Sequence, residues 1–155
     1  MIPFNVPPYA GQEDEYVLEA IHNHKICGDG PFTKRCHAAL EAMTGTGKAL
    51  LTTSGSSALE MAAILCDVAP GDEVILPSFT FSSTANAFAL RGATLVFADI
   101  CPDTMNINPE CIRTAITERT KVIVPMHYAG VCCDMAAINA MAKERGIFVV
   151  EDAAQ

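Results

Sequence analysis

The sequence contains few basic residues and no long hydrophobic run. Ten lysines and arginines stand against 18 aspartates and glutamates, which gives a formal net charge of -8. Nucleic acids and anionic membranes attract basic patches, so this charge argues against both as partners. No apolar segment is long enough to cross a bilayer, and the first residues lack the basic start and apolar core of a signal peptide. We therefore expect a cytoplasmic protein.

Several common site motifs are also absent. The seven cysteines are odd in number, irregularly spaced and without a C-x-x-C pair, which predicts reduced thiols that mostly serve packing. His22, His24 and Cys27 lie close in sequence, but a metal site would need further ligands, so a structural or surface role is favoured. Neither the P-loop pattern G-x-x-x-x-G-K-[ST] nor the dinucleotide pattern G-x-G-x-x-G occurs, so neither nucleotide site is predicted.

The stretch from Thr52 to Cys66 is the most informative one that is present. The apolar run 49–51 predicts a strand, residues 52–57 are small and mostly hydroxylated, and an apolar helix is expected from about Ser57. Such a turn directs unpaired N–H groups and the positive end of a helix dipole towards one point, where a phosphate could bind. An ordinary serine N-cap is the alternative interpretation.

Short apolar strands and helices alternate along most of the chain. Strands are expected at residues 73–77, 94–99, 122–126 and 147–150. Helices are expected at residues 13–24, 32–43, 109–117 and 134–145, and within 78–90 after a hydroxyl-rich loop. This alternation predicts an α/β fold with a mainly parallel sheet that helices cover on both faces. A chain of 155 residues is long enough to form one compact domain.

Polar residues follow the expected strands, and ligands of such sheets bind outside the carboxyl ends of the strands. Residues 54–57, 78–81, 127–128 and 152–155 should therefore share one rim. Asp152 could be a solvated strand end, a ribose ligand, or the partner of a heterocyclic nitrogen that it keeps protonated. Phe81 could stack on a flat cofactor or belong to the core. His127 could be an acid, a base or a substrate ligand, or it could be structural.

Four segments of the sequence occur in a characteristic order. They are T-S-G-S-S-A-L-E-M-A, P-G-D-E-V-I-L-P-S-F-T-F-S-S-T-A-N-A, V-P-M-H-Y-A-G and V-V-E-D-A-A-Q. Together they resemble the sugar aminotransferases of the DegT/DnrJ/EryC1/StrS family, over essentially the whole chain. The resemblance implies the fold-type I architecture, with pyridoxal 5'-phosphate as the cofactor.

Further segments narrow the resemblance within this family. I-P-F-N-V-P-P, C-G-D-G-P-F-T-K-R-C, P-D-T-M-N-I and H-Y-A-G-V are similar to members that aminate a dTDP-linked 4-keto-6-deoxyhexose for surface polysaccharide synthesis. The implied amino donor is L-glutamate. Family members act as dimers with sites at the interface, which implies a homodimer for the parent enzyme, and the loop 28–31 is a candidate for reaching the partner subunit.

The resemblance also assigns roles to single residues. The turn that holds the cofactor phosphate corresponds to three consecutive residues: Gly55, Ser56 and Ser57. Phe81 falls where an aromatic ring stacks on the pyridine ring, Asp152 where an acid pairs with the ring nitrogen, and Gln155 near the phenolic oxygen. His127 lies in a loop near the substrate. Position 56 is threonine in many members, and serine preserves the hydroxyl.

The catalytic lysine of the family, which forms the internal Schiff base, lies downstream of the E-D-A-A-[QH] motif, and all five lysines of this chain precede that motif. We therefore expect residues 1–155 to be the N-terminal part of the cofactor-binding large domain, without the small C-terminal domain. We expect no transamination by this chain alone. Two alternatives stay open: a related sugar dehydratase, in which histidine replaces the lysine, and a non-catalytic remnant that only binds.

Overall fold

The structure is a computed structural model that describes residue 3 and residues 5–154. The chain divides into two compact units, residues 1–51 and 52–155, which are described separately. Within the part of the chain that the structure describes, none of the helices has the length and apolar character that a membrane span requires.

The first unit contains two helices, α1 (Glu13–His22) and α2 (Pro31–Thr44). Helix α2 begins with a proline in its first turn, where the missing N–H is harmless, and ends at Gly45, whose φ of 70° suits a left-handed helix cap. The guanidinium of Arg35 lies 5.2 Å from the ring centroid of Tyr16 and 4.7 Å from that of Phe32. These cation–π contacts connect the two helices, neither of which has a buried residue.

The second unit has the alternating strands and helices that the sequence predicts. Its strands are β1 (Glu73–Pro77), β2 (Thr94–Ala98), β3 (Thr120–Ile123) and β4 (Phe148–Val149). Its helices are α3 (Gly55–Leu65), α4 (Ser82–Ala89), α5 (Pro109–Ala115) and α6 (Met135–Arg145), with the short 3₁₀ helix η1 (Tyr128–Gly130). The strands pair in parallel in the order β2-β1-β3-β4. The predicted α/β fold is confirmed.

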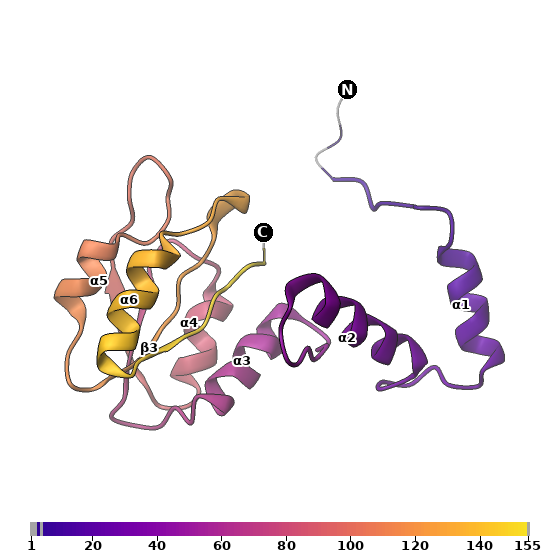
Figure 1. Ribbon diagram of the computed structural model, residues 1–155, viewed down its shortest axis with the longest axis horizontal. Helices are drawn as coiled ribbons and strands as arrows, with labels where there is room; N and C mark the ends of the chain where they lie inside the picture. The colour runs from indigo at the N-terminus through magenta and orange to yellow at the C-terminus, as the bar shows by residue number, and fades with distance from the viewer. Residues whose placement is uncertain (1–2, 4, 155) are drawn as a thin grey trace. The chain divides into compact units, whose positions relative to one another are not determined.

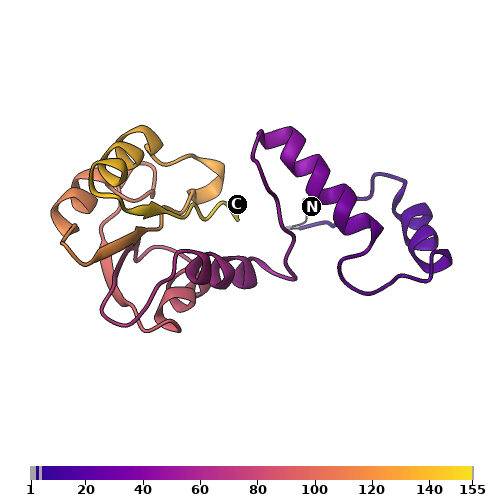
Figure 2. The same cartoon turned by 60° about the horizontal axis from the view of Figure 1, so that its bottom comes forward.

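Helices cover both faces of this sheet, as Figures 1 and 2 show. Val74, Leu76 and Val122 pack with α3 and α4 on one face, and Ile75 and Ile123 pack with α5 and α6 on the other. Successive residues of a strand point to opposite faces, so a strand buried on both sides must be apolar throughout. This explains the continuous hydrophobic run 74–76.

The ends of the helices follow capping rules. Asn108 Oδ1 accepts a hydrogen bond of 2.9 Å from the Glu110 amide at the start of α5, and Asp134 Oδ1 accepts one of 3.0 Å from the Ala137 amide at the start of α6. Helix α6 ends at Gly146, whose φ is 67°. Both starts agree with the sequence prediction, whereas α3 begins two residues before the expected Ser57.

A buried acid, Glu73, is the first residue of β1 and lies beside the amino end of β3. The Glu73 side chain is 5% exposed, forms an ion pair with Arg119 and accepts a hydrogen bond from the Thr117 hydroxyl. A buried carboxylate needs such partners, because it has lost its hydration. An ion pair therefore links the amino end of β1 to the residue that precedes β3.

The strand expected at residues 49–51 is wrong. These residues are not extended alongside any described strand, and their backbone bonds go instead to side chains of α2. The Ala49 amide donates to Glu41 Oε1 at 3.1 Å, and the Leu51 amide donates to His37 Nε2 at 2.9 Å. Apolar composition alone does not make a strand, because a strand needs a neighbour to complete its ladder of hydrogen bonds.

Candidate functional site

A pocket of about 370 Å³ lies where β1, β3 and β4 run out at their carboxyl ends. Residues from three of the four expected rim segments line it, including Thr80, Phe81, Tyr128 and Asp152. This volume falls within the range of small-molecule sites, about 300–1,000 Å³. The rim predicted from the parallel sheet therefore contains a real concavity.

Asp152 is the buried acid of this pocket, with 8% of the residue exposed. Its backbone continues the pairing of β3 and β4, because its amide donates to the Pro125 carbonyl at 2.9 Å and its carbonyl accepts from the His127 amide at 3.0 Å. Its carboxylate accepts a hydrogen bond of 2.6 Å from the Thr84 hydroxyl and one of 3.3 Å from the Ala154 amide. Both the main chain and the side chain of the acid are thus held in place.

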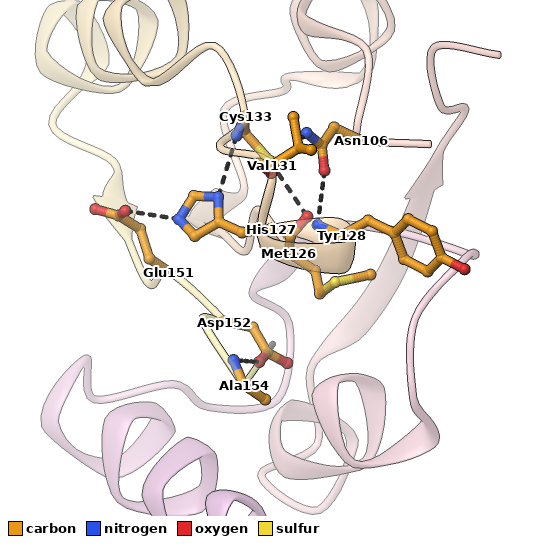
Figure 3. A network of polar contacts seen from close by, with 9 residues as sticks. All are labelled: Asn106, Met126, His127, Tyr128, Val131, Cys133, Glu151, Asp152 and Ala154. Atoms are coloured by element: carbon orange, nitrogen blue, oxygen red, sulfur yellow. Dashed lines mark hydrogen bonds and ion pairs between the residues drawn. The ribbon is translucent and has the colours of Figure 1, made fainter. Parts of the chain in front are cut away.

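Aromatic side chains form the opposite part of the pocket wall. The rings of Phe79 and Tyr128 have centroids 4.9 Å apart at 52°, and Phe81 projects as an exposed ring, 77% accessible, from the residue that precedes α4. Asn106 fixes the Tyr128 loop from behind: its Oδ1 accepts from the Tyr128 amide at 2.8 Å and its Nδ2 donates to the Val131 carbonyl at 2.9 Å (Figure 3).

His127 is not among the residues that line the pocket. Figure 3 shows its imidazole between Glu151 and the backbone of Cys133. The Cys133 amide donates to Nδ1 at 3.1 Å, so Nδ1 carries no proton, and Nε2 is 2.9 Å from Glu151 Oε2, to which it donates. Both nitrogens are therefore engaged, and the geometry favours the structural interpretation of His127 over the expected substrate contact.

The predicted phosphate turn lies at the start of α3. Ser54 caps the helix by accepting from the Ser57 amide at 3.1 Å, which leaves the preceding amides at the open end of the helix. A Cβ atom added to Gly55 would meet nothing within 4 Å, so a ligand has room to approach this backbone. The hydroxyls of Ser56 and Ser83 lie 2.6 Å apart, which joins the first turns of α3 and α4.

Sequence reasoning missed Thr84 and Asn106, and it placed Gln155 at a position outside the described residues. Thr84 is fully buried among the small residues of α4, and Asn106 is buried before α5. A threonine within an apolar helix face is a weak signal, because such a residue often bonds to its own helix. The partner of Thr84 is 68 residues away, so only the folded chain identifies it.

The parallel sheet, its covering helices and the pocket at its carboxyl edge define an α/β domain built to bind a small molecule. The chain matches the DegT/DnrJ/EryC1/StrS aminotransferase family over residues 8–155, and it belongs to this family.

Individual relatives agree with this assignment. The chain is 40% identical over 153 residues to the spore coat polysaccharide biosynthesis protein SpsC of Bacillus subtilis (strain 168). The aligned region covers 99% of this chain and 39% of SpsC. It is similar to the structure of the aminotransferase TlmJ from Streptoalloteichus hindustanus, with a TM-score of 0.92 and 36% identity, covering 99% of this chain and 42% of TlmJ. It is also similar to the PLP form of Spr1654 from Streptococcus pneumoniae, with a TM-score of 0.88 and 32% identity, covering 99% and 43%. The chain therefore spans about two fifths of the length of these relatives.

Solved structures of these relatives include a PLP form and a PMP form, so pyridoxal phosphate is the cofactor of the family. The pocket fits this group in three respects. It offers a buried carboxylate at its wall and an exposed aromatic ring at its edge. The third feature is the open end of α3 with space at Gly55, which is not among the residues that line the pocket but is joined to the first turn of α4 by the contact between Ser56 and Ser83. These are the chemical partners of a ring nitrogen, a ring face and a phosphate, respectively.

Proposed function

We propose that this chain forms the cofactor-binding part of a PLP-dependent sugar aminotransferase. The observation that carries the proposal is Asp152, a buried carboxylate in the wall of a pocket at the carboxyl edge of a parallel sheet. Burial of an ionised acid is unfavourable unless it meets hydrogen-bond donors. Thr84 and Ala154 supply two donors, and a ring N–H of the cofactor would supply a third.

Each remaining contact has a proposed role. The amides and hydroxyls of residues 55–57 would bind the phosphate at the positive end of α3, and Phe81 would cover one face of the ring. Asp152 would hold a proton on the ring nitrogen, and Gln155 would lie near the phenolic oxygen, as the family resemblance implies. When bound, pyridoxal phosphate acts as an electron sink for the amino-group transfer.

The proposed substrates follow from the resemblance within the family. The parent enzyme would move an amino group from glutamate to a dTDP-linked 4-keto-6-deoxyhexose, as a dTDP-4-amino-4,6-dideoxygalactose transaminase of enterobacterial common antigen synthesis does. The name of SpsC, a polysaccharide biosynthesis protein, supports a role in surface polysaccharide synthesis. We propose a homodimer for the full-length enzyme.

Transamination by the 155-residue chain alone is not part of this proposal. No lysine is among the described residues that line the pocket. Lys121 is occupied elsewhere in the unit, because its ammonium donates to the Asp67 carbonyl at 2.6 Å and lies 3.3 Å from Asp72 Oδ2. A nucleophilic amine is required to carry the cofactor through the reaction. The chain should therefore bind the cofactor without turning over an amino donor.

Binding of pyridoxamine 5'-phosphate tests the proposal, because this form of the cofactor needs no lysine. Equilibrium dialysis would compare the protein with Asp152→Asn, which retains the size of the side chain but removes its charge. A hydrogen bond to a charged group is worth about 1.5–3 kcal/mol, so the dissociation constant should rise roughly 10- to 100-fold. Asp103→Asn, at an exposed acid outside the pocket, is the matched control and should bind like the wild type. Equal binding by Asp152→Asn and wild type would refute the proposal.

A further inference from the structure

Thr84 carries a buried hydroxyl whose two side-chain hydrogen-bond partners line the pocket. The residue has no exposed surface, and its Oγ1 lies 2.6 Å from Asp152 Oδ2 and 2.8 Å from Thr80 Oγ1. Thr80 and Asp152 both line the pocket, whereas Thr84 lies behind them. Burial of a hydroxyl is unfavourable unless its hydrogen bonds are satisfied, and here both partners belong to the site.

The chemistry of the three groups fixes the direction of these hydrogen bonds. An ionised carboxylate only accepts, so the single hydroxyl proton of Thr84 goes to Asp152. Thr84 must then accept from Thr80, which donates its own proton. The result is a relay in one direction, from Thr80 to Thr84 to Asp152, and each hydrogen bond strengthens the next by polarising it.

We propose that Thr84 is a positioning residue for Asp152, and that the Thr80–Thr84 relay holds the carboxylate in the orientation that meets the cofactor ring. This inference rests on the proposed function, in which Asp152 faces the ring nitrogen. The relay commits Oδ2 to the protein, while Oδ1 accepts, from the part of the chain that the structure describes, the long bond of 3.3 Å from the Ala154 amide. The carboxylate thus keeps accepting capacity for a donor in the pocket, and its rotation is restricted.

Two substitutions at position 84 distinguish the effect of the hydroxyl from the effect of side-chain packing. Thr84→Val keeps the shape of the side chain and removes the hydroxyl, whereas Thr84→Ser keeps the hydroxyl and removes a methyl group. In the ligand-free protein, the ¹³C resonance of the Asp152 carboxyl, identified by its loss in Asp152→Asn, should move in Thr84→Val and stay in place in Thr84→Ser. This measurement reports the relay without any cofactor.

Binding of pyridoxamine 5'-phosphate labelled with ¹⁵N in its ring tests the positioning itself. Thr84→Val should weaken binding about tenfold, which corresponds to about 1.4 kcal/mol, while Thr84→Ser stays within about twofold of wild type. The ring-nitrogen resonance should show loss of the proton at lower pH in Thr84→Val, because a misaligned carboxylate stabilises the ring cation less. Thr80→Val should produce a smaller change in the same direction.

The outcomes distinguish this inference from the function on which it rests. If Asp152→Asn weakens binding but Thr84→Val behaves like wild type, the positioning role is overturned and the proposed function stands. If Thr84→Ser is as damaging as Thr84→Val, packing explains the effect and the relay is overturned. If the wild type does not bind the cofactor, or binds it no better than Asp152→Asn, both proposals fail.

Discussion

Replacing His127 with alanine should destabilise the protein strongly, because this buried side chain connects the segment before α6 with the segment after β4. The residue is 7% exposed, and its two ring nitrogens bond to the Cys133 amide and to Glu151. Alanine would leave the buried Cys133 amide without an acceptor and would leave a cavity in place of the imidazole. A histidine that binds substrate would instead need a ring nitrogen that is free of protein partners and directed at the pocket.

The magnitude follows from the separate losses. An unpaired buried amide costs about 1–3 kcal/mol, and the loss of the bond to half-exposed Glu151 costs about 0–1 kcal/mol. Truncation of a buried side chain adds a loss of packing of roughly 2 kcal/mol, so the total should be about 3–6 kcal/mol. The unfolding temperature of a domain of this size shifts by about 2–4 °C per kcal/mol, which predicts a fall in Tm of roughly 6–24 °C.

Urea unfolding followed by circular dichroism measures this change, provided that the slope of the transition stays constant. Glu151→Gln is the matched control, because the amide oxygen of glutamine can still accept the proton of Nε2. It should change the free energy of unfolding by less than about 1 kcal/mol. A loss below about 1 kcal/mol in His127→Ala would refute the structural role and return His127 to the candidates for substrate binding.

Two further predictions concern the rest of the second unit. Arg119→Met should destabilise the protein by about 1–3 kcal/mol in urea unfolding, because it removes the charged partner of the buried Glu73 carboxylate and leaves the Thr117 hydroxyl as its side-chain donor. An unchanged midpoint of unfolding would show that the ion pair contributes nothing to stability. Iodoacetamide should modify exposed Cys132 well before its neighbour Cys133, whose pKa is raised by burial. At a fixed pH the first reaction should therefore be much faster than the second, and equal rates by peptide mass spectrometry would contradict the buried environment of Cys133.

Local signals in the sequence predicted much of the fold. Residues 73–77 form the predicted strand, and the Asn108-Pro109 start and the Gly146 end of the corresponding helices are where capping rules expect them. The rim prediction holds for three of its four segments, because parallel strands place their final residues at one edge. The segment 54–57 does not line the pocket, and the strand expected before it at residues 49–51 does not form.

The parts that the sequence did not reveal depend on distant partners. Residues 49–51 have the composition of a strand but bond to side chains of α2. The structural role of His127 depends on Cys133 and Glu151, and that of Thr84 on Asp152, and no local pattern encodes these pairs. Side-chain hydrogen bonds between remote segments follow from the tertiary fold, so they become visible only when the strands are in register.

Asp152 forms a bridge with Met126 just beyond β3 and β4, and this position has a consequence for the timescale of the site. Its amide and its carbonyl both bond to the chain just beyond β3, so the acid cannot move away without opening the sheet. Such opening breaks two backbone hydrogen bonds, so it should be rarer than the opening of a loop. Ligand entry and release should therefore proceed through the side of the pocket that carries the exposed Phe81 ring, while the acid stays fixed as a reference point throughout each binding event.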